Sequence, residues 1–266
     1  MTFGPNHYVP VLKVKRGEKK ALCSVLSPLR SRMTPLLEIV ERKPDKAAIV
    51  SAHLDTAFKE LASSVAGYSR CFLDAREVAA DGPAAAAEVF QRASAAGMVY
   101  TPVTGISRTA DVAAALAHRA HGIALRLTRD DFENGNLTQS LPAFMTRHGL
   151  TPESTDLVVD LGAVDDLIVN GIAALTAAFL ADVPDHQRWR TVTVSACAFP
   201  KSMGGVARNS SNSVERADWL AWRDHLHASR SSLPRLPTFS DCAIQHPNGV
   251  EGFNRSSEPA RSSSST

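Results

Sequence analysis

The sequence has few of the features that mark secreted, membrane or nucleic-acid-binding proteins. Its four cysteines, Cys23, Cys71, Cys197 and Cys242, are far apart and form no CxxC pair, which favours free thiols in a reducing compartment. No apolar run approaches the ~20 residues that a transmembrane helix needs, and no signal peptide opens the chain. The formal net charge is only +2, which disfavours nucleic-acid and membrane partners. We therefore expect a cytoplasmic protein.

Eight short apolar stretches have the alternation of β-strands, and helical patterns separate them. The expected strands are 7–15, 34–40, 71–77, 99–104, 123–128, 156–162, 189–198 and 238–244. The expected helices are 17–28, 45–65, 83–96, 109–121, 137–148, 165–180 and 212–230. Such alternation implies parallel strands joined by right-handed crossovers. Eight strands, with no GxGxxG after the first, favour an α/β fold of the (β/α)8 TIM-like barrel type over a dinucleotide-binding sheet.

The apolar pattern fails after the last expected strand. No normal eighth helix is expected there, so one side of the barrel should be thinly covered. From position 248 the chain is polar and becomes Ser-rich, a composition typical of disorder. We expect a single barrel domain over residues 1–247 and a disordered tail over 248–266.

Charged residues recur late in the expected strands, on the faces opposite the mostly aliphatic ones. They are Lys13, Glu38, Asp74, Arg76, Arg126, Asp160 and Asp241. If the aliphatic faces contact the helices, these charges point into the barrel, near the C-terminal mouth where barrel enzymes have their active sites. The pattern therefore predicts that seven charges from six strands converge.

This convergence has two interpretations. In the first, Lys13, Arg76 and Arg126 bind a phosphate or carboxylate group, while Glu38, Asp74, Asp160 and Asp241 supply a general acid and base. In the second, the charges are an ion-paired plug, for example Asp74 with Arg76 or Arg126 with Asp160, and do no chemistry. Whether the protein is an enzyme stays open.

Two further features bear on a site. Lys201 follows the seventh strand in a Gly-containing loop, where many barrels hold phosphate, although it is equally consistent with a solvated loop lysine. Mg²⁺ is a weaker alternative for the carboxylates, because the cations already compensate them and no HxH or HExxH motif is present. The sequence identifies no metal site and no cofactor.

With these residues located, the chain resembles the phage-type "beta protein" family. The resemblance rests on the order and spacing of five segments: 8–18 (YVPVLKVKRGE), 34–38 (TPLLE), 72–76 (FLDAR), 156–162 (DLVVDLG) and 241–247 (DCAIQHP). It implies a protein of undetermined activity from prophage, mobile-element or antiviral defence settings. The chain departs from the family at Ser240-Asp241-Cys242, where members have Gly-Asp-Tyr, and in its Ser-rich tail, which suggests a truncated or altered C-terminus.

Two functions follow as hypotheses. The first is a barrel that binds or hydrolyses a small anionic, phosphorylated ligand at its mouth. The second is a non-catalytic scaffold in a phage or defence system, with Trp219, Trp222 or the tail contacting a protein partner.

Overall fold

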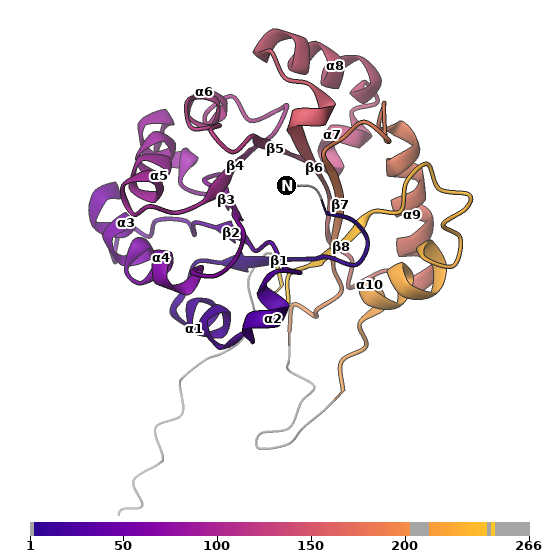
Figure 1. Cartoon of the computed structure of the whole chain (residues 1–266), viewed down its shortest axis with the longest axis horizontal. Coiled ribbons are helices and arrows are strands. Elements are labelled where there is room, and N and C mark those ends of the chain that lie inside the picture. Colours follow the sequence, from indigo (N-terminus) through magenta and orange to yellow (C-terminus); the bar gives the residue numbers. More distant parts are fainter. Residues whose placement is uncertain (1–2, 203–212, 244–245, 248–266) are drawn as a thin grey trace, which may run out of the picture.

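The computed structural model describes residues 3–202, 213–243 and 246–247, which form a closed barrel of eight parallel strands (Figure 1). The strands follow one another around the barrel in sequence order. They are β1 (Tyr8–Lys13), β2 (Leu36–Glu38), β3 (Cys71–Asp74), β4 (Tyr100–Thr104), β5 (Ile123–Thr128), β6 (Thr155–Ala163), β7 (Thr191–Cys197) and β8 (Thr238–Asp241). The prediction of a (β/α)8 TIM-like barrel is confirmed.

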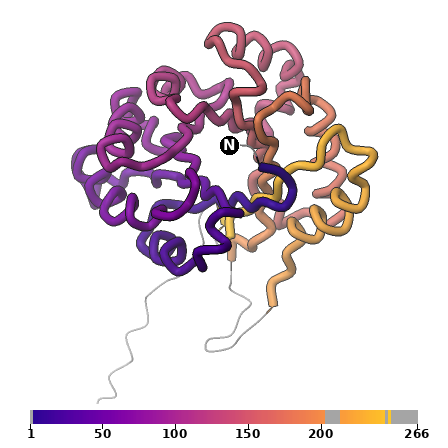
Figure 2. The backbone as a smooth tube through the Cα atoms, viewed as in Figure 1, coloured from indigo at the N-terminus to yellow at the C-terminus, as the bar shows by residue number. Residues whose placement is uncertain are grey.

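Helices surround this barrel on the outside (Figures 1 and 2). The α-helices are α1 (Arg16–Ser24), α2 (Ser27–Arg30), α3 (Val50–Phe58), α4 (Leu61–Ser64), α5 (Pro83–Ala95), α6 (Val112–Ala117), α7 (Arg129–Glu133), α8 (Leu137–His148), α9 (Val169–Asp182) and α10 (Ala217–Leu220). Short helical segments are η1 (Ala79–Asp81), η2 (Pro152–Ser154) and η3 (Ala221–Leu226), of which η3 is a π-helix continuing α10. No described helix is long and apolar enough to cross a membrane.

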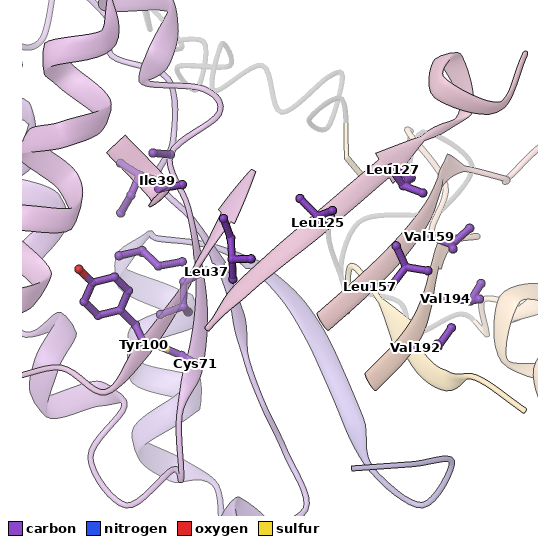
Figure 3. Close-up of a cluster of buried hydrophobic side chains, with 14 of the residues drawn as sticks. Leu37, Ile39, Cys71, Tyr100, Leu125, Leu127, Leu157, Val159, Val192 and Val194 are labelled. Atoms are coloured by element: carbon purple, nitrogen blue, oxygen red, sulfur yellow. The ribbon is translucent and has the colours of Figure 1, made fainter. Parts of the chain in front are cut away.

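Alternation along the strands divides the core into two layers, because successive side chains point to opposite faces. The outer layer, shown in Figure 3, packs aliphatic residues such as Leu37, Leu125 and Val159 against the helices. The inner layer is smaller and lies inside the barrel. It consists of Val9, Val11, Leu36, Phe72, Val103, Ala124 and Val158. The charged residues that continue the inner faces therefore lie directly above an apolar floor.

One expected helix is divided. The sequence pattern predicts a continuous helix over 45–65 capped by Asp45, but α3 begins at Val50 after Ile49, which makes no side-chain cap. The helix is interrupted at Glu60, whose φ of 63° is left-handed. Helix propensity and apolar spacing could not reveal this break, because a left-handed non-glycine residue is set by the packing of its neighbours.

Other helix boundaries also differ from the expected ones. The helix expected from 212 begins at Ala217, and residue 212 itself lies outside the described residues. The helix expected from Asp165 begins at Val169. The short helix α7 was not predicted, although Thr128 and Asp131 form a capping box at its start.

The side of the barrel after β8 carries no helix among the described residues, and Figure 1 shows α10 and α2 flanking this side. Outward-facing Tyr8 and Phe239 lie in a groove of about 820 Å³, which Trp219 and Trp222 also line. Elsewhere, the N-terminal segment crosses one end of the barrel, where Phe3 contacts Phe72. The expected tail over 248–266 lies outside the described residues.

Candidate active site at the barrel mouth

Arg126 is the centre of the charge cluster. Its side chain, which is only 4% exposed, extends from β5 into the barrel. Nε donates to Asp160 Oδ2 at 2.8 Å, and Nη1 donates to Glu38 Oε1 at 2.7 Å and to Asp74 Oδ2 at 2.9 Å. One guanidinium group therefore joins carboxylates from β2, β3 and β6 across the barrel axis.

A second arginine extends this network. Arg108, in the loop after β4, donates from Nη2 to Asp74 Oδ1 at 2.7 Å and also pairs with Asp111. Thr104, the last residue of β4, donates to Asp111 Oδ1 at 2.6 Å. The two oxygens of Asp74 thus serve two different arginines, so Asp74 links the two parts of the network.

Two carboxyl groups of the network have pKa values shifted in opposite directions. Burial alone would raise the pKa of Asp74, but the cations of Arg108 and Arg126 outweigh it and hold the Asp74 pKa well below its usual range. Burial raises the pKa of Asp111 in spite of Arg108. Asp74 therefore stays ionised near neutral pH and cannot act as a general acid.

A pocket of about 280 Å³ opens beside the network, between β1, β2 and the residues after β8. Glu38 and Lys13 line it together with apolar residues such as Val11 and Leu12. Lys13 donates from Nζ to the carbonyl of Pro247 at 2.6 Å, and an ammonium group has two further protons to donate. Glu38 is thus shared between the buried network and the wall of the pocket.

Arg76 lies at the rim of the mouth and not inside the barrel as expected. Because β3 ends at Asp74, the chain has already turned away, and the Arg76 side chain is 37% exposed. Its Nη2 is 3.9 Å from Glu38 Oε1 and 3.3 Å from Glu77 Oε1. Its backbone N–H, not its side chain, contacts Asp74, at 2.9 Å.

Asp241 does not face the barrel interior, and the prediction that it does is wrong. Residues paired between neighbouring strands share a face, and Ser240 pairs with inward-facing Val9. Asp241 therefore shares the outer face of Phe239, which packs on Trp219 at 5.0 Å between ring centroids. This aromatic contact determines which residues of β8 face outward and which face the barrel interior.

On that outer face, Asp241 has partners of its own. Arg216 Nη2 donates to Asp241 Oδ2 at 2.5 Å, and Tyr8 Oη donates to Oδ1 at 2.6 Å. Arg216 also pairs with Asp218 at 3.0 Å. Asp241 is thus part of a separate ion-pair cluster behind β8.

Beneath the mouth, β7 and β8 present small polar side chains to the barrel interior. Ser195 pairs in register with both Asp160 and Ser240, and the hydroxyls of Ser195 and Ser240 are buried with no hydrogen-bond partner among the described residues. Just above, the contact between Cys197 and Cys242 lowers the pKa of the first thiol and raises that of the second.

The comparison with known proteins decides the family. A family model described as "Beta protein" matches residues 8–260. The chain belongs to the Beta protein family. No curated protein matches it.

The sequence predicted the central residues of this site in the Beta protein family chain, but not the loop residues that pair with them. Glu38, Asp74, Arg126 and Asp160 come together as predicted, and Lys13 and Arg76 lie at the mouth beside them. Arg108 and Asp111, together with Arg216, were missed. They lie in loops, where no strand parity indicates direction; the only available signal was that Arg108 and Asp111 follow a strand at the mouth end. Lys201 lies in the loop after β7, and its role stays a prediction.

In the part of the chain that the structure describes, no group of three or more His, Cys, Asp or Glu side chains is arranged to hold a metal ion. The carboxylates at the mouth are instead arranged around guanidinium groups.

Proposed function

We propose that the barrel mouth binds a small anionic molecule, such as an organic phosphate or carboxylate, in the pocket between β1, β2 and the residues after β8. One observation carries this proposal. Glu38 is 7% exposed and is held by the buried Arg126, yet it also lines a pocket that contains Lys13. A fixed carboxylate beside a cation in a concave, mostly apolar pocket is a usual arrangement for a ligand site.

Not every cation of this site would bind the anionic group. Arg126 already contacts three carboxylates and positions them, so it does not serve as the anion receptor. Lys13 and the partly exposed Arg76 would bind the anionic group. Glu38 would accept a proton from a water or hydroxyl group of the bound molecule, which suits a hydrolytic reaction.

Thermal unfolding with a panel of nucleotides, sugar phosphates and small carboxylic acids tests the proposal. A compound at about a hundred times its Kd adds ~2.7 kcal/mol, which raises Tm by several degrees in a domain of this size. The expected shift disappears in Lys13→Met and in the isosteric Glu38→Gln. Arg188→Gln, which removes a surface cation far from the pocket, is the matched control and should retain it.

A shift that persists in both mouth variants would contradict the proposal. The absence of any shift from a cooperatively folded protein would contradict it as well. That outcome would favour a second candidate function, a partner-binding component of a phage or defence system. The groove after β8 favours that candidate, because Trp219 is 38% exposed there and the position normally belongs to the eighth helix of a barrel.

The occupant that fits this groove is a helix of a partner protein with aromatic or aliphatic anchors and an acidic residue for Arg32, which also lines it. Co-purification with the product of a neighbouring gene tests this. We expect a complex of fixed stoichiometry that Trp219→Ser abolishes and Arg188→Gln preserves. A complex insensitive to Trp219→Ser would count against the groove.

A further inference from the structure

The end of the barrel opposite the mouth carries an arginine cluster that the proposed function does not use. Arg70 precedes β3, Arg190 precedes β7, and Asp156 is the second residue of β6, so all three lie where the strands begin. Asp156 is fully buried. It accepts five hydrogen bonds: from Arg70 Nη1 at 2.7 Å and Nη2 at 3.1 Å, from Arg190 Nη2 at 2.6 Å and Nε at 3.0 Å, and from Thr191 at 2.6 Å.

This cluster is short of negative charge. One carboxylate serves two guanidinium groups, so one positive charge in the buried cluster is uncompensated by the residues that contact it. Arg70 is 5% exposed, and its Nε has no hydrogen-bond partner among the described residues. Its guanidinium carbon lies over the rings of Phe3 and Phe72, 5.4 and 5.1 Å from the ring centroids. A buried cation with a free donor is costly unless an anion approaches it.

A pocket of about 550 Å³ lies against the same arginines. Arg119 and His121 add a third guanidinium and an imidazole to its wall, and Ser69 and Ser154 add hydroxyl-bearing side chains. None of the described residues that line it is acidic. The nearby Glu153 is already paired with Arg188 at 2.7 Å. The volume is in the range of small-molecule sites.

The backbone at this pocket is adapted to the arginines. Gly122 has φ of +90°, and a Cβ at this position would lie 2.2 Å from Arg190 Nη1. Arg190 Nη1 also donates to the carbonyl of His121 at 3.1 Å. The absence of a side chain at Gly122 is therefore what allows the guanidinium group to lie across this turn, at the edge of the pocket.

From this arrangement we infer that the pocket formed by Arg70, Arg119 and Arg190 at the N-terminal end of the barrel binds a small phosphomonoester. Arg70 and Arg190 each use two nitrogen atoms on Asp156 and contribute positive charge to the pocket. Arg119, which contacts a backbone carbonyl and no carboxylate among the described residues, is therefore the arginine that grips the phosphate oxygens. Val99, Ile123 and Leu150 supply an apolar wall for the organic part. This site is separate from the mouth: its arginines precede the strands, whereas the mouth residues end them.

Isothermal titration with inorganic phosphate and with phenyl phosphate tests the inference. The wild-type chain should bind both at millimolar concentrations or below, and phenyl phosphate more tightly because its ring contacts the apolar wall. Arg119→Gln and Arg190→Gln should each weaken phenyl phosphate binding about tenfold or more, since each removes a charged hydrogen-bond donor. Gly122→Ala should weaken it as well by displacing Arg190.

Two control variants make the result specific. Arg223→Gln, which removes the same charge from an exposed position on η3 that does not line the pocket, should leave the affinity unchanged; circular dichroism establishes that each variant is folded. Absence of phosphate binding in the wild type, or binding that survives both Arg119→Gln and Arg190→Gln when the mouth cation is also removed by Lys13→Met, overturns the inference. Binding lost only in Arg76→Gln would place the anion at the mouth, which overturns this site and supports the proposed one.

Discussion

At the scale of single residues, the charge next to a buried group decides whether that group is ionised near neutral pH. Asp74 is ionised because two arginines contact it, whereas His7 is kept neutral. Burial and, to a smaller extent, the nearby Arg70 charge lower the pKa of His7 to about 4. His7 contacts Thr34 Oγ1 through Nε2 at 2.9 Å and stacks on Phe3, so it helps to hold the N-terminal segment against the barrel.

This low pKa makes a prediction for stability against pH. Because the folded-state pKa of His7 lies below the unfolded value of 6.5, the unfolded chain binds the proton first. Stability is therefore complete above pH 6.5 and lost as the pH falls toward 4. The free energy of unfolding should fall between pH 7 and pH 4, and in His7→Gln this fall should be smaller by on the order of 1–2 kcal/mol, after allowance for the partial exposure of His7. Urea unfolding at pH 7, 5.5 and 4 measures this; parallel curves for the two proteins would contradict it.

At the scale of helices and strands, packing overrides local helix preference most clearly in the segment before β3. The segment before β3 has the composition of one helix but forms α3 and α4, separated at Glu60, whose φ is 63°. The left-handed conformation costs roughly 1–2 kcal/mol for a residue with a Cβ, and glycine adopts it freely.

Glu60→Gly should therefore stabilise the protein. We expect a gain of about 0.5–1 kcal/mol in the free energy of unfolding, because relief of the strain exceeds the entropy that glycine adds to the unfolded chain. Glu60→Ala, which retains the Cβ, is the matched control and should show no comparable gain. Urea denaturation of the three proteins at pH 7 gives the answer, and a loss of stability in the glycine variant would show that the Glu60 side chain matters more than its backbone.

At the scale of the whole molecule, Arg126 joins parts of the barrel that are far apart in sequence. Its partners Glu38, Asp74 and Asp160 come from three other strands. Removing the cation leaves three nearly buried carboxylates with less compensation, and breaking a buried ion pair in this way usually costs ~3–5 kcal/mol.

We expect Arg126→Met to lose stability in this range, with a lowered midpoint of urea unfolding. Arg76→Gln, which removes a rim cation that is 37% exposed, should change stability by no more than about 0.5 kcal/mol. Equal effects of the two substitutions would show that Arg126 is not the structural centre of the network.

The sequence by itself determined the barrel, because alternating strands separated by helical patterns leave few other ways to bury the aliphatic faces. It also determined that Glu38, Asp74, Arg126 and Asp160 would meet, since strand parity and position toward the strand end place them on the inner face.

Only the tertiary structure decided the rest. Packing of Phe239 on the tryptophans turned Asp241 outward, and the end of β3 at Asp74 placed Arg76 at the rim. Arg108 and Arg190 joined their carboxylates from loops, whose direction no periodicity encodes. The charge balance at each end of the barrel could not be predicted from the sequence either, because it depends on which charged side chains meet across the barrel and not on how many there are.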